Sequence, residues 1–129
     1  MEIVKMATLG LSGTLLVFVG SMRLFNPIKT YLKNSGITID NNVDLLNEMR
    51  GVSAVMLVGG LLLFLGILLP QLAHSSFMVG ALIFLGFAVG RIFGMMTDGR
   101  PNKQIVQGLG FEIVLGSANL VCWIMVAMG

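Results

Sequence analysis

The chain has 129 residues, of which 56% are apolar and 11% are charged, and its mean hydropathy is +0.93. A soluble domain carries about 25% charged residues, so these values exclude most soluble enzyme classes and predict that much of the surface faces lipid. The formal net charge of +2 argues against nucleic-acid binding, and a single cysteine, Cys122, excludes an internal disulfide, a CxxC redox pair and a cysteine-built zinc site.

Four apolar stretches are long enough to cross a membrane, because a helix needs about 20 mostly apolar residues to span the hydrocarbon core. We therefore expect an all-α membrane protein with one domain, residues 1–129, built as an antiparallel bundle of four transmembrane helices. The expected spans are about 3–25, 44–69, 75–96 and 101–128. The first is interpreted as a retained span, because its apolar run exceeds a secretory signal core and no A-x-A-like cleavage site follows it.

The connections between the spans carry their own signals. Residues 27–34 place three apolar side chains on one helical face, with Lys29 and Lys33 beside them. This pattern predicts a short amphipathic helix that lies in the headgroup region. Asp44 is expected to cap the second span, and Pro101 is expected to occupy the first position of the fourth.

The distribution of lysine and arginine predicts the orientation of the bundle. With four spans, both termini lie on the same side of the membrane, and that side carries Lys5 alone. The other lysines and arginines all lie at or near the opposite face. Cytoplasmic loops carry an excess of these residues, so both termini are expected outside the cytoplasm.

Three charged residues, Arg50, Arg91 and Glu112, lie farther inside the expected spans than any other. At 1.5 Å of rise per residue, Arg50 and Arg91 lie about 9 Å, and Glu112 about 16 Å, from the same membrane face. Unpaired charge in lipid is costly, and two or three arginines, with Arg23 at the end of the first span as the third, face one deep acid. The pattern therefore predicts a polar pocket for an anionic headgroup, carboxylate or phosphate. The structural alternative is that both arginines extend to the interface and Glu112 pairs with one of them to fix helix register.

Residues on the same helical faces, or in the turn beside them, complete the predicted site. The candidate ligand-binding residues are Asn47, Arg50, Phe84, Phe87, Arg91, Asp98 and Glu112. Phe84 and Phe87 are expected to line the apolar part of the ligand. No catalytic residue, metal site or cofactor is predicted, because His74 is the single histidine and the sequence holds no nucleophile or cofactor motif.

Glycines recur at helical spacing on the last two spans. Gly86, Gly90 and Gly94 form a continuous GxxxG series, and Gly108 and Gly116 flank Glu112 on the fourth span. Small residues let helices approach closely, so these five glycines are predicted to mediate helix packing. Contact within the chain is the favoured interpretation of the GxxxG series, and a homo-oligomer is the alternative.

Part of this pattern resembles a known family. The matching residues are Asn47-x-x-Arg50-Gly51, Arg91, Asp98-Gly99-x-Pro101 and Glu112. The pattern is similar to that of an uncharacterised family of small bacterial four-helix integral membrane proteins, a domain-of-unknown-function family. The resemblance implies the four-span topology, a bacterial inner membrane and a shared polar set made of these residues, but it implies no activity.

The favoured interpretation is a non-enzymatic membrane protein whose pocket near one membrane face binds an anionic amphiphile or lipid-like ligand. Arg50 and Arg91 would contact the acidic head, and Glu112 would orient the arginines or carry an exchangeable proton. The alternatives are a proton-coupled small transporter or pore that acts as an oligomer, and a scaffold or accessory subunit of a larger membrane complex. The expected partners are a membrane lipid or small amphiphile, a second copy of the chain or another membrane protein, and not a nucleic acid.

Overall fold

The computed structural model describes residues 2–129, which form five α-helices and one short 3-10 helix, with no strand in that range. The helices are α1 (Glu2–Phe25), α2 (Pro27–Ser35), α3 (Val43–Leu68), η1 (Pro70–Leu72), α4 (Ala73–Asp98) and α5 (Lys103–Met128). Four of them, α1, α3, α4 and α5, are long and apolar enough to cross a membrane. The chain therefore has the character of an integral membrane protein.

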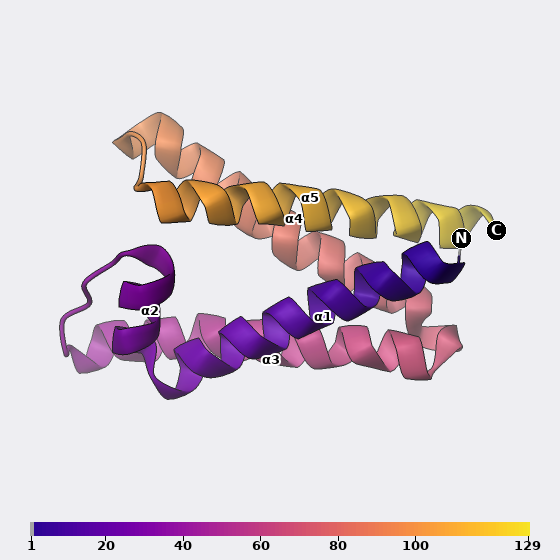
Figure 1. Cartoon of the computed structure of the whole chain (residues 1–129), viewed down its shortest axis with the longest axis horizontal. Helices are drawn as coiled ribbons and strands as arrows, with labels where there is room; N and C mark the ends of the chain where they lie inside the picture. The colour runs from indigo at the N-terminus through magenta and orange to yellow at the C-terminus, as the bar shows by residue number, and fades with distance from the viewer. Residues whose placement is uncertain (1) are drawn as a thin grey trace.

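The long helices are arranged as two pairs (Figure 1). α1 packs along α3, α4 packs along α5, and the pairs are joined where α3 turns through η1 into α4. Both ends of the chain lie at one end of the bundle, and α2 lies at the opposite end. The polar connections therefore gather at the α2 end, where the sequence analysis places most of the positive charge.

Asparagine side chains begin two of the long helices. The Oδ1 atom of Asn42 accepts from the backbone N–H of Asp44 at 2.9 Å, and that of Asn102 accepts from Ile105 at 3.0 Å. The expectation that Asp44 caps the second span and that Pro101 begins the fourth is therefore wrong. Both asparagines have extended backbone, which lets the side chain turn back to the free N–H groups of the first turn.

The helix expected over residues 27–34 is present as α2. Pro27 occupies its first turn, where a missing N–H costs nothing. Gly36 ends it in the left-handed region at φ 67°, and its N–H donates to the Leu32 carbonyl at 3.2 Å. The next N–H, of Ile37, donates to Tyr31 at 3.2 Å, which completes a hydrogen-bonded C-terminal cap.

Glycines bring α1 and α3 into close contact. A Cβ atom built on Gly60 would lie 2.9 Å from the Val17 backbone nitrogen and 3.0 Å from the Gly13 carbonyl oxygen. Beyond this crossing, buried apolar side chains from all four long helices fill the core. They are Leu9, Leu16, Met56, Leu63, Phe77, Phe84 and Cys122.

Only one of the five glycines that were predicted to mediate helix packing lies against another helix. Gly116 packs against Leu85 of α4, so that a Cβ atom there would lie 3.2 Å from the Leu85 nitrogen. By contrast, a Cβ atom on Gly86, Gly90, Gly94 or Gly108 would meet no atom within 4 Å in residues 2–129 apart from its chain neighbours and the adjacent backbone of its own helix. The GxxxG series therefore does not pack within the chain, because α4 turns other residues toward α3 and α5. Its glycines border open space instead.

Candidate functional site

An ion pair joins the two helices of the α4–α5 pair inside the bundle. The Nε atom of Arg91 donates to Oε1 of Glu112 at 2.8 Å. The Glu112 side chain is 12% exposed and that of Arg91 is 30% exposed, so the pair is largely withdrawn from the surface. One guanidinium and one carboxylate balance each other at this contact.

A second guanidinium, that of Arg23, reaches the same region from the end of α1. Its carbon Cζ lies 4.5 Å from the centroid of the Tyr31 ring, and Nη2 donates to Oγ of Ser35 at 3.2 Å. Its Nε atom is buried and has no hydrogen-bond partner within residues 2–129. Arg23 is therefore positioned by α2 and retains a free donor.

Arg23, Arg91 and Glu112 line one small cavity of about 120 Å³ between the four long helices. Its other lining residues are Leu15, Leu16, Val19, Met56, Phe84, Phe87, Gly108 and Phe111. Two cations and one anion give the lining a formal charge of +1, and the remaining wall is apolar or aromatic. Such a wall makes the surplus charge costly unless an anion enters.

The structure separates three predicted residues from this cavity. Arg50 and Asn47 are exposed, and the Arg50 Nη1 atom donates to the Leu24 carbonyl of α1. The expectation that Arg50 meets Glu112 is wrong, because α3 packs on α1 and α4 and is not adjacent to α5. Asp98 is also exposed. It lines a separate pocket of about 220 Å³ at the end of α4, and Arg91 lines this pocket as well as the cavity.

Gln104 of α5 and Asn102, the N-cap residue of α5, hold α2 in place. Asn102 Nδ2 donates to the Ser35 carbonyl at 2.7 Å, and Gln104 Nε2 donates to the Lys33 carbonyl at 3.0 Å. Ser35 thus accepts from α5 through its carbonyl and from Arg23 through its hydroxyl. These bonds connect α1, α2 and α5 at the end of the bundle where the charges gather.

Comparison with known proteins gives a family but no activity. A family model described as a domain of unknown function, DUF4345, matches residues 4–124. The chain belongs to this family. No curated protein and no solved structure matches the chain. The function of this DUF4345 chain is therefore argued from its own residues.

The sequence analysis of this DUF4345 chain missed Arg23 as a cavity residue. Arg23 follows the buried Leu16 by seven residues, which is two turns of helix, so both lie on the inward face of α1. This spacing is readable from the sequence. Arginines are common at the ends of membrane spans, so the position of Arg23 in the last turn of α1 did not indicate that it lines a cavity.

Proposed function

We propose that this chain binds the acidic headgroup of an anionic amphiphile in the cavity between Arg23, Arg91 and Glu112. The observation that carries the proposal is the surplus of one positive charge in a largely apolar wall. Glu112 already accepts from Arg91, which leaves Arg23 without a carboxylate partner within the described residues. A carboxylate or phosphate would supply the missing charge and accept from the buried Nε atom of Arg23.

The size of the cavity limits what enters it. About 120 Å³ is room for roughly four water molecules, well below the roughly 300 Å³ at which sites for whole small molecules begin. The headgroup alone would therefore lie inside. The apolar tail would leave between α1 and α5, which pack only loosely against each other, past the exposed ring of Phe111. Phe84 and Phe87 would contact the first carbons of the tail.

This function requires a membrane setting, which we include in the proposal. The four long helices would form an antiparallel transmembrane bundle in a bacterial inner membrane, with both termini outside the cytoplasm. The helix α2 would lie at the interface, and its two lysines and the surrounding arginines would face the cytoplasm. In this arrangement the cavity lies about two helical turns below the membrane surface, within reach of a lipid headgroup.

The test is the ligand content of the purified protein. The wild type, Arg23→Gln and Arg91→Gln are extracted in a mild detergent, and bound acidic amphiphiles are measured by mass spectrometry after solvent extraction. We expect both variants to retain at least tenfold less of one acidic species. Arg100→Gln is the matched control, because Arg100 is exposed in the turn between α4 and α5. Equal content in all four proteins would contradict the proposal and favour a scaffold.

A second candidate function follows from the open glycines of α4. Gly86, Gly90 and Gly94 border empty space, as a helix from another copy would require, and Glu112 supplies a protonatable group inside the bundle. These features suit an oligomeric proton-coupled transporter or pore. A strictly monomeric particle that shows no pH-driven flux in liposomes would exclude this alternative.

A further inference from the structure

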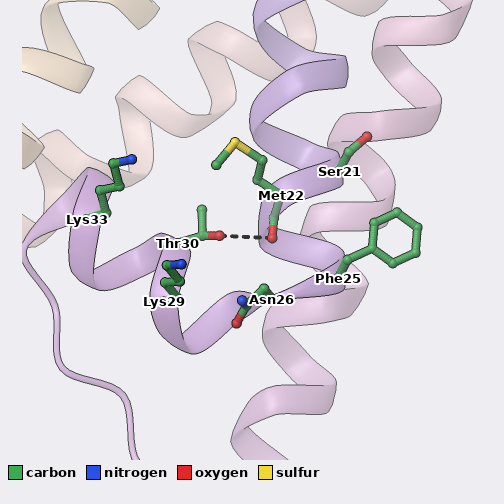
Figure 2. Close-up of a pocket in the computed structure, with 7 residues that line it drawn as sticks. All are labelled: Ser21, Met22, Phe25, Asn26, Lys29, Thr30 and Lys33. Carbon is green, nitrogen blue, oxygen red and sulfur yellow. Dashed lines mark hydrogen bonds between the residues drawn. The ribbon is translucent and has the colours of Figure 1, made fainter.

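Another pocket lies where α1 turns into α2, apart from the cavity and from the pocket at the end of α4 (Figure 2). Its volume is about 400 Å³. The lining residues are Ser21, Met22, Phe25, Asn26, Lys29, Thr30 and Lys33. Neither Arg23, Arg91 nor Glu112 lines it, so the two sites can be tested separately.

The shape of this pocket is fixed by bonds on both sides of α2. Buried Thr30 donates its hydroxyl to the Met22 carbonyl at 2.9 Å, which holds the first turns of α2 against α1 (Figure 2). On the other side, Asn102 and Gln104 of α5 donate to carbonyls of α2. A ligand that enters the pocket therefore does not have to order α2 first, and this lowers the cost of binding.

The charged residues that line the pocket are both lysines. Lys29 and Lys33 lie one turn apart, both are exposed, and neither forms an ion pair within residues 2–129. No carboxylate lines the pocket. The Asn26 side chain makes no capping bond, and the first turn of α2 holds no acid, so the positive end of this helix also lacks a counter-charge. These groups together select an anion.

The other wall is apolar, which identifies the kind of anion. Met22 and Phe25 line it, and the Phe25 ring is 76% exposed at the end of a helix that is long enough to span a membrane. A free phosphate ion would gain nothing from these side chains. A phospholipid would place its phosphate between the lysines and its glycerol and first acyl carbons along Met22 and Phe25.

We propose that the α1–α2 pocket binds the phosphate-bearing headgroup of an anionic membrane phospholipid through Lys29 and Lys33. This site goes beyond the proposed function, because it lies outside the bundle and uses none of the cavity charges. It requires only that α2 lie at the membrane surface, where the exposed lysines meet headgroups and the Phe25 ring meets the acyl region. Bound lipid would then fix how deep α1 and α2 sit in the bilayer.

The experiment is native mass spectrometry of the full chain in micelles that contain equal amounts of phosphatidylglycerol and phosphatidylcholine. We expect the wild type to retain phosphatidylglycerol preferentially. Each lysine near an anionic headgroup contributes on the order of fivefold in affinity, so Lys29→Gln/Lys33→Gln should lower the preference by about 25-fold. Lys103→Gln, an exposed lysine at the start of α5, is the matched control and should keep it.

Two further arms distinguish lipid binding in this pocket from lipid binding in the cavity and from the binding of free phosphate. Arg91→Gln removes a cavity charge, and in that background Lys29→Gln/Lys33→Gln should still lower the phosphatidylglycerol preference by the same factor, so failure of the cavity proposal would not affect this result. Inorganic phosphate at millimolar concentration should not displace the lipid. Retention of the preference by the double lysine variant in the Arg91→Gln background, or displacement of the lipid by free phosphate, would overturn the proposal. Circular dichroism of the double variant checks that it folds, which we expect because both lysines are exposed.

Discussion

Asn119 of α5 donates to the hydroxyl of Ser12 of α1 at 3.0 Å, and both residues are fully buried. The same amide nitrogen also donates to the Leu115 carbonyl at 2.8 Å. This contact joins the two helix pairs in the apolar core, near the Thr8–Cys122 contact of the same helices. Neither Asn119 nor Ser12 lines the charged cavity, so we assign their contact to holding the bundle together.

Ser12→Ala should therefore lower the stability of the protein. The substitution leaves an Asn119 donor without its partner in α1, and interhelical hydrogen bonds of this kind contribute about 1 kcal/mol in membranes. Thermal unfolding in detergent, followed by circular dichroism, measures the loss. Ser117→Ala on the outer face of α5 is the control.

Asn119→Leu combined with Ser12→Ala should recover part of the stability, because no unpaired amide remains. Equal stability of all variants would contradict this role.

The Arg91–Glu112 pair should show strong coupling between its two side chains. Arg91→Gln and Glu112→Gln each leave one charge without its partner inside the bundle, so each should lower the unfolding free energy by about 2 kcal/mol. The double variant Arg91→Gln/Glu112→Gln should lose less than the sum of the two, which a double-mutant cycle measures. Additive losses would show that the two groups do not interact.

The Lys5–Glu2 pair is the matched control for that cycle. Its atoms lie 3.6 Å apart, and the Glu2 side chain is 83% exposed. Water screens such a pair, so Lys5→Gln should leave the unfolding transition unchanged within error. A loss as large as that of Glu112→Gln would mean that burial is not what makes the interior pair important.

The fold was largely predictable from the sequence, because the apolar runs are long and their ends are polar. The predicted spans differ from α1, α3, α4 and α5 by at most two residues at any end. The differences arise where local capping decides the boundary. Asn42 and Asn102, and not Asp44 or Pro101, begin their helices, because an asparagine side chain reaches the free N–H groups of the first turn.

The composition of the candidate site was predictable only in part. Depth measured from one membrane face indicated that the long Arg91 side chain can reach the deeper Glu112, and the structure brings them together. The depth of a residue does not show which helices are neighbours. Arg50 was therefore predicted in the site, although its helix α3 is not adjacent to α5. Arg23 takes the place that was predicted for Arg50, because Arg23 of α1 lines the cavity, whereas α3 contributes only Met56 to its lining.

The hydrogen bonds between α5 and α2 should control the mobility of α2. Asn102→Ala removes both the cap of α5 and the bond to the Ser35 carbonyl, whereas Asn42→Ala removes the cap of α3 alone. Hydrogen exchange over residues 27–35 should therefore become about fivefold faster in Asn102→Ala, as expected for a loss of about 1 kcal/mol. It should stay unchanged in Asn42→Ala. Equal exchange in both variants would show that α5 does not hold α2.

The two kinds of glycine should respond in opposite ways to the same substitution. In Gly60→Ala the new Cβ atom would lie within 3.0 Å of backbone atoms of Val17 and Gly13, so α1 and α3 must move apart. We expect a loss of about 1 to 3 kcal/mol, measured by thermal unfolding. In Gly90→Ala the new atom meets nothing within 4 Å, and alanine favours the helix by up to about 1 kcal/mol. A monomer should therefore be as stable as the wild type or more stable.

Gly90→Leu then tests what occupies the open face of α4. If a second copy packs on Gly86, Gly90 and Gly94, the larger side chain should dissociate the oligomer without unfolding the monomer, because nothing within residues 2–129 touches that position. Light scattering of the detergent-solubilised protein measures the mass, and circular dichroism measures the fold. An unchanged mass would mean that lipid, and not another copy, covers these glycines. The oligomeric transporter or pore would then lose the observation that favours it.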